Sequence, residues 1–154
     1  MTDAFLRKLK TFSHQPLFVK LWICPVWLML ALARLTVLII PFRSIAPLLG
    51  RHIGLDAFIP LTTDQKQKRA HLIGKTIRIS AKYAPWDANC FAQAIVARIL
   101  LKTYKIPYSI FFGLKPTAND IGKMDAHAWT TSDRVAVTGG HGFDRFTVVA
   151  TFTG

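Results

Sequence analysis

Cys90 is the residue of this sequence whose surroundings best fit nucleophilic chemistry. It follows Asp87-Ala88-Asn89, and we expect it in the first turn of a helix that runs from Ala88 to about Tyr104, with Asp87 as its cap. Unpaired backbone N–H groups and the positive end of the helix dipole favour a thiolate there. The same N–H groups can donate to an oxyanion that forms during attack on a carbonyl.

His127 is the proton partner that a cysteine nucleophile needs. It lies in Asp125-Ala126-His127-Ala128-Trp129, which we expect in a strand. A cysteine at the start of a central helix and a histidine in the following sheet are the arrangement that a cysteine peptidase requires. The structural alternative is a small buried cysteine and a histidine that is only hydrogen-bonded.

The residue that orients His127 is not settled by the sequence. The predicted hairpin places Thr138 or Gly139 opposite His127, so a backbone carbonyl is one possibility. His141, in a glycine-rich loop, is an alternative base, although a solvated side chain is its simpler interpretation. The candidates with a carboxylate are three aspartates on or near the predicted strands: Asp125, Asp133 and Asp144.

Hydrophobic periodicity predicts the elements that must position these residues. One helix is predicted from Thr63 to about Lys82. The next helix, which carries Cys90, is apolar around most of its circumference, so we expect it to be the central helix of the fold. After Pro107 the pattern alternates, with a polar loop at Lys115–Lys123. Helices followed by antiparallel strands predict an α+β fold. The predicted strands are Tyr108–Leu114, Met124–Thr131, Arg134–Thr138 and Arg145–Phe152.

The first 50 residues are predicted to be helical, with breaks at Pro16, Pro25 and Pro41. Residues 51–60 are predicted to be irregular. The uncharged run Leu21–Ala33 is shorter than the roughly 18–20 residues that span a bilayer. Three interpretations of this run stay open: a buried or partner-facing helix, a peripheral membrane contact, or a signal peptide. We expect one stripe to pack in the core, or in part to dock a partner protein: Leu28, Leu32, Leu35 and Ile39.

The length of 154 residues predicts one domain, 1–154, with an apolar helical part at 1–60 and a catalytic core at 61–154. The net charge is +12, but the basic residues are scattered and no nucleic-acid motif accompanies them, so nucleic acid is not an expected partner. Cys24 and Cys90 are too few for a disulfide framework, and no zinc spacing is present. We expect a cytoplasmic protein with no metal or cofactor.

Three segments together resemble the transglutaminase-like leader peptidases of lasso-peptide biosynthesis: Trp86–Ala94, Ile110–Leu114 and Ala126–Trp129. The run Ile39–Arg43 is similar too, so the likeness covers nearly the whole chain. The resemblance implies a transglutaminase-like or papain-like core, with Cys90 as nucleophile and His127 as base. It also implies a peptidase that removes the leader from a ribosomally made precursor peptide.

The resemblance implies partners as well. In this family a macrolactam synthetase closes the freed core peptide, and a small recognition domain, fused or separate, binds the leader. Because the chain begins directly with apolar helices, we expect the split form with a separate leader-recognition protein. Family activity is tied to ATP, but no phosphate-binding motif occurs here and we expect no ATP binding. The alternative function is a non-catalytic scaffold of the same maturation complex, suggested by the missing third acid.

Overall fold

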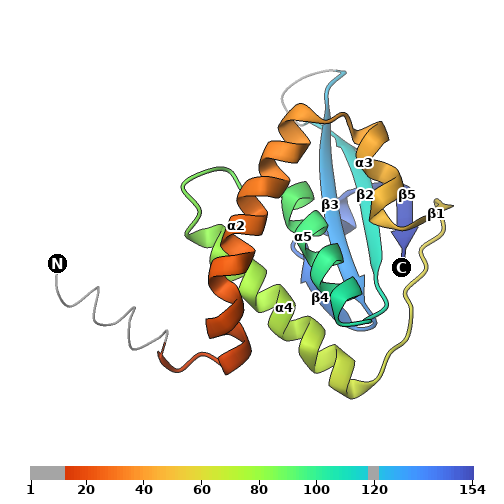
Figure 1. Cartoon of the computed structure of the whole chain (residues 1–154). Helices are drawn as coiled ribbons and strands as arrows, with labels where there is room; N and C mark the ends of the chain where they lie inside the picture. The colour runs from red at the N-terminus through yellow and green to blue at the C-terminus, as the bar shows by residue number, and fades with distance from the viewer. Residues whose placement is uncertain (1–12, 118–121) are drawn as a thin grey trace.

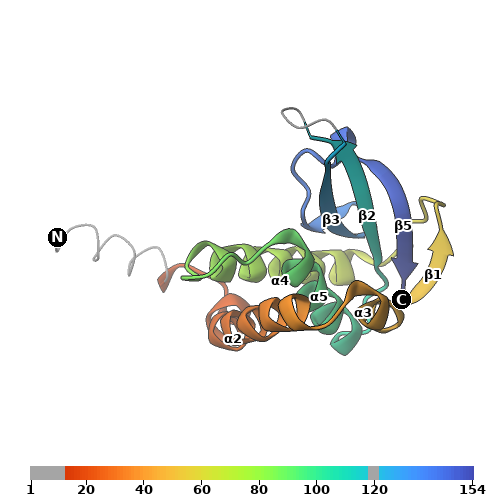
Figure 2. The same ribbon diagram turned by 90° about the horizontal axis from the view of Figure 1, so that it is seen from above.

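The computed structural model describes residues 13–117 and 122–154, and it confirms the α+β class. In these residues a layer of helices lies beside one antiparallel sheet (Figures 1 and 2). The predicted polar loop and the start of the predicted N-terminal helical part lie partly outside the described residues. The helices are α2 (Leu17–Ile39), α3 (Phe42–Leu49), α4 (Asp64–Lys82) and α5 (Cys90–Thr103). The strands are β1 (Arg51–Gly54), β2 (Ser109–Pro116), β3 (Met124–Ser132), β4 (Val135–Thr138) and β5 (Thr147–Thr153).

The sheet has the strand order β1-β5-β2-β3-β4. β2 and β3 pair in a continuous antiparallel register that sets Gly113 opposite His127. The predicted turn between β3 and β4 is confirmed, with Asp133 at a φ of 51°. Because β5 lies on the far side of β2, the chain between β4 and β5 must pass β3 and β2. That connection contains the short 3₁₀ helix η1 (Phe143–Arg145).

Helix α5 is the central helix, as predicted. It packs against α2, α4 and β3 (Figure 1). The sheet residues that share its hydrophobic cluster include Ile110, Ala128, Val137 and Phe152. Since side chains alternate across a strand, these residues identify the face of the sheet that the helices cover. The buried residues of α5 lie on several sides of the helix: Ala92, Ala94, Val96, Ala97, Leu100 and Leu101.

Helix α4 begins where the sequence predicts. Thr63 caps it by accepting a hydrogen bond from the Lys66 N–H. Asp133, at the β3–β4 turn, accepts hydrogen bonds at 2.9 Å from the Thr62 N–H and from Gln67 Nε2. The start of α4 is therefore tied to the hairpin that follows His127 in sequence.

The predicted break at Pro25 is wrong, because α2 continues through it from Leu17 to Ile39. A proline removes one helix hydrogen bond and crowds the preceding turn, but the residues on both sides of it are held in the core by their apolar side chains. Pro16 and Pro41 do precede helices, as predicted. The buried residues of α2 are Phe18, Val19, Val26, Leu30 and Ala33.

Residues 51–54 form a strand, although the sequence predicted irregular structure. β1 pairs with the end of β5, where Arg51 lies opposite Thr153. Gly50, with a φ of 139°, joins α3 to this strand, and a Cβ there would lie 2.4 Å from the Thr153 carbonyl oxygen. The pairing is long-range in sequence, which is why the local pattern did not indicate it.

The expected core stripe of α2 is exposed, which is a second correction. Leu28, Leu32, Leu35 and Ile39 are 56%, 57%, 53% and 70% exposed. The helix is apolar on both faces, so periodicity alone could not show which face turns inward. By length and composition α2 is long and apolar enough to cross a membrane, and only 17% of its most apolar 18-residue window is buried.

Candidate active site

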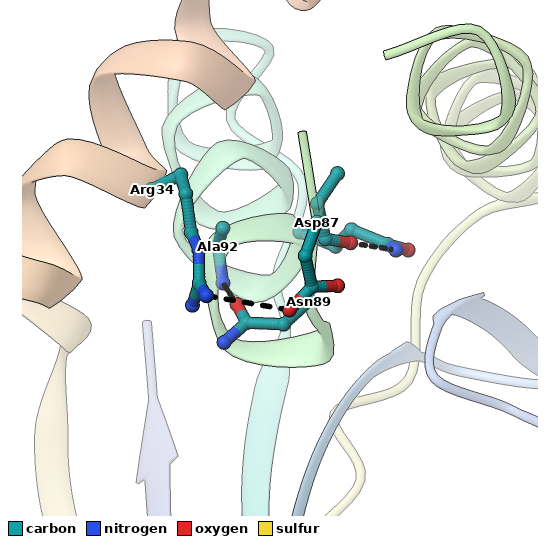
Figure 3. Close-up of polar contacts among 6 residues, drawn as sticks. Arg34, Asp87, Asn89 and Ala92 are labelled. Atoms are coloured by element: carbon teal, nitrogen blue, oxygen red, sulfur yellow. Dashed lines mark hydrogen bonds and ion pairs between the residues drawn. The ribbon is translucent and has the colours of Figure 1, made fainter. Parts of the chain in front are cut away.

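Cys90 is the first residue of α5, so the expectation that it lies in the first turn is confirmed. The predicted cap is wrong, because Asn89 and not Asp87 caps the helix. Asn89 Oδ1 accepts a hydrogen bond from the Ala92 N–H at 3.0 Å (Figure 3). The Cys90 side chain is half-buried and packs against the core. The thiol is thus fixed at the positive end of the helix dipole.

Asp87 has a different role, which is to join the segment before Cys90 to α2. Its carboxylate forms an ion pair with Arg34 at 3.3 Å (Figure 3). Next to it, the rings of Trp86 and Trp27 meet edge to face with centroids 4.5 Å apart. Two side chains of α2 therefore hold the connection that leads into the helix N-terminus.

His127 is held in a fixed position on β3. Its Nε2 donates a hydrogen bond to the Gly139 carbonyl oxygen at 2.8 Å. The ring lies near the rings of Trp129 and Phe146, with centroids 5.8 and 4.9 Å away. A neutral ring that donates from Nε2 keeps Nδ1 as its basic nitrogen.

The two predicted catalytic groups, Cys90 and His127, lie toward opposite faces of the sheet. Alternation along β3 places His127 and Trp129 on one face and Ala128 on the other. Ala128 belongs to the hydrophobic cluster shared with α5, and Cys90 packs against that cluster. Between these two described residues, no hydrogen bond joins the thiol to the ring. The catalytic pairing of Cys90 with His127 therefore stays a prediction.

The aspartates considered for the third role have other surroundings. Asp125 accepts a hydrogen bond from Thr117 Oγ1 at 2.9 Å and lies 3.8 Å from Lys115 Nζ. Asp133 is bonded to the start of α4, and Asp144 is an exposed residue of η1. The acceptor beside His127 is instead the Gly139 carbonyl, one of the alternatives that the sequence left open.

A pocket of about 390 Å³ lies between α4, α5 and the end of β4. His141, the alternative base, is exposed and lines this pocket with Gln93, which is one turn beyond Cys90 in α5. Arg78 of α4 contributes a cation. Gly74 allows the close approach that shapes the pocket, because a Cβ there would lie 2.5 Å from the Val137 carbonyl oxygen. Sequence reasoning did not place Arg78 or Gln93 in a site, because their proximity depends on the packing of α4 against α5 and β4.

Within the ranges 13–117 and 122–154, no group of three or more His, Cys, Asp or Glu side chains is arranged to hold a metal ion.

Comparison with known proteins bears on the whole arrangement. No curated protein and no solved structure matches this chain. A family model described as "Transglutaminase-like superfamily" matches residues 36–151, which is most of the chain and includes both Cys90 and His127. The match begins at the end of α2 and ends within β5, so it covers α3, α4, α5 and nearly all of the sheet, whereas most of α2 lies outside it. This chain belongs to the transglutaminase-like superfamily.

Proposed function

We propose that this protein is a cysteine peptidase that removes the leader from a lasso-peptide precursor. The observation that carries the proposal is the position of Cys90, at the first residue of a capped central helix inside the transglutaminase-like region. The resemblance of Trp86–Ala94 and Ala126–Trp129 to the leader peptidases supplies the substrate class. A separate leader-recognition protein, a macrolactam synthetase and a cytoplasmic setting belong to the same proposal.

The proposed reaction begins when the Cys90 thiolate attacks the carbonyl of the scissile bond. The backbone N–H groups of Cys90 and Phe91 precede the first intrahelical hydrogen bond, so they are the donors available to the resulting oxyanion. His127 protonates the departing amine, which leaves the leader as a thioester on Cys90. Water then attacks the thioester while His127 accepts one of its protons, and the bond to the Cys90 sulfur breaks to release the leader as a carboxylic acid.

This mechanism requires the ring of His127 to reach the thiol. The ring lies on the face of β3 turned away from the helical cluster, so a side-chain rotation alone does not bring it to Cys90. The strand must turn over or shift its register with β2 at His127. β4 ends at Thr138, opposite Thr130, so β3 has no ladder partner on that side at the level of His127. The following connection contains Gly139 and Gly142, both at positive φ. We propose that binding of the precursor drives this change in β3 and completes the pair.

The direct test is cleavage of a precursor peptide, followed by mass spectrometry, with and without the recognition protein. We expect the wild-type protein to release the leader and Cys90→Ala to give no product, because no other group replaces the nucleophile. Cys24→Ala is the matched control and should cleave like the wild type, since Cys24 is an exposed residue of α2. Circular dichroism checks that both variants fold. Full cleavage by Cys90→Ala would refute the proposal.

The base is assigned by the same assay with two histidine variants. His127→Ala should reduce the cleavage rate at least about a hundredfold, as expected for loss of a general base. His141→Ala should leave the rate within about threefold, because we assign it no proton transfer. The reverse result would move the base to the pocket beside Gln93.

A second candidate is a non-catalytic scaffold that gathers precursor, recognition protein and synthetase. The observation that favours it is the absence of a hydrogen bond between Cys90 and His127. The scaffold hypothesis expects no cleavage by the wild-type protein with any combination of partners, together with co-purification of the assembled complex.

A further inference from the structure

The outward face of α2 carries a row of large aliphatic side chains, interrupted at the exposed Cys24 and Pro25, which we call the outer stripe. Their spacing of three, four or seven residues places them on one side of the helix. A helix of this length extends for about 35 Å, at a rise of ~1.5 Å per residue. The outer stripe consists of Leu17, Leu21, Leu28, Leu32, Leu35 and Ile39, which are 70%, 65%, 56%, 57%, 53% and 70% exposed.

The opposite face of α2 is committed to the core. Val19, Val26 and Leu30 are fully buried, and α2 packs against both α4 and α5. Leaving this position to cross a bilayer would expose these residues and empty part of the core. Figure 2 shows α2 at the border of the helical layer that is farther from the sheet. The outer stripe is thus presented outward on a helix that stays in place.

The sequence segment that contains α2 carries charge of one sign. Between Asp3 and Asp56 the sequence has no acidic residue. Arg34 is engaged by Asp87 of another segment, whereas Arg43, in the first turn of α3, is exposed. An apolar face flanked by cations matches an anionic bilayer, where each Lys or Arg near the surface contributes about 1 kcal/mol of attraction. The basic residues of this segment are Arg7, Lys8, Lys10, Lys20, Arg34, Arg43 and Arg51.

The composition of the stripe separates a lipid surface from a protein partner. The energetically important residues of protein interfaces are mostly Trp, Tyr and Arg, and Leu is under-represented among them. The outer stripe is made of five leucines and one isoleucine. Aliphatic side chains without a polar group suit the boundary between headgroups and acyl chains. Exposed apolar surface of this extent is unusual on a soluble monomer.

We propose that the outer stripe of α2 lies in the surface of an anionic lipid bilayer, with the helix axis parallel to the membrane. The helical core remains packed above the membrane, and the exposed Arg43 lies at headgroup level. The inference is independent of the proposed peptidase function, because it rests on α2 and its charge and not on Cys90.

Sedimentation of the full chain with vesicles tests the proposal. We expect binding to vesicles of phosphatidylcholine with 30% phosphatidylglycerol, and at least about tenfold weaker binding to phosphatidylcholine alone. The triple variant Leu28→Gln, Leu32→Gln, Leu35→Gln should bind the anionic vesicles at least about tenfold more weakly. A matched control replaces exposed apolar residues elsewhere, Leu55→Gln and Leu61→Gln, and should bind like the wild type.

The outcomes separate the possible occupants of the stripe. Absence of wild-type binding to anionic vesicles would overturn the proposal, and so would unchanged binding of the triple variant. Sedimentation velocity without lipid shows whether copies of the chain associate through the stripe. Self-association that the triple variant abolishes, without vesicle binding, would assign the stripe to a second copy instead. Circular dichroism confirms that the glutamine variants keep their helices.

Discussion

At the scale of single residues, two opposing properties govern the reactivity of the Cys90 thiol. Exposure favours reaction at Cys24, which is solvent-accessible, whereas Cys90 is half-buried. The positive end of the helix dipole stabilises negative charge on sulfur as Cys90 reacts, while Cys24 lies in the interior of α2. The order of reaction therefore shows which property dominates.

We predict that Cys90 reacts with iodoacetamide faster than Cys24 at neutral pH, by at least about threefold. Peptide mapping by mass spectrometry after timed labelling gives both rates from one sample. Cys24→Ala and Cys90→Ala each isolate one thiol and serve as controls for the assignment. Faster labelling of Cys24 would mean that exposure decides the order, as expected for a structural cysteine in a scaffold.

At the scale of elements, Pro25 interrupts the hydrogen bonding of a helix that the fold nevertheless keeps continuous. Replacing it with alanine restores an N–H that can donate to the Leu21 carbonyl, and it removes the clash of the proline ring with that turn. We predict that Pro25→Ala raises the free energy of unfolding by about 1–3 kcal/mol, measured by urea denaturation.

Pro16 provides the matched control for that measurement, because it precedes the first turn of α2 and is exposed. Pro16→Ala should change the free energy of unfolding by no more than about 0.5 kcal/mol. A loss of stability in Pro25→Ala would show that the proline supplies something other than a missing hydrogen bond, such as a bend that the packing of Val26 requires.

The elements that the sequence predicted well are those whose signals are local. Thr63 and the apolar spacing that follows it predict α4. The alternation of side chains after Pro107 predicts β2. β1 was missed because its structure depends on pairing with β5 at the other end of the chain. The inward face of α2 was assigned wrongly because both of its faces are apolar.

The same distinction applies to the candidate site. The position of Cys90 in the first turn followed from the polar residues that precede it and the apolar run that follows. A backbone carbonyl was left open as the acceptor without being assigned to a residue, and the structure supplies it from Gly139. The observed register, with Thr138 opposite Thr130, differs from the predicted hairpin. The sequence could not show whether the ring of His127 faces α5. That depends on which face of β3 the helices cover, and the pattern of β3 alone does not reveal it.

At the scale of the whole molecule, the excess of positive charge lowers the stability of the fold but strengthens the proposed binding to an anionic membrane. Twenty basic residues and eight acidic ones give a net charge of +12. Such an excess destabilises a compact state through self-repulsion, and salt screens that repulsion. The same screening weakens the attraction of the chain to an anionic bilayer.

We therefore predict that raising NaCl from about 20 to about 300 mM increases the free energy of unfolding in urea, by on the order of 1 kcal/mol, as the Debye length falls from roughly 20 to 6 Å. Over the same range, sedimentation with anionic vesicles should decrease. The apolar outer stripe limits that decrease, because the burial of leucine in the bilayer does not depend on screening. A fall in stability with salt would contradict the prediction, since it would mean that attractive charge pairs outweigh the repulsion among the basic residues.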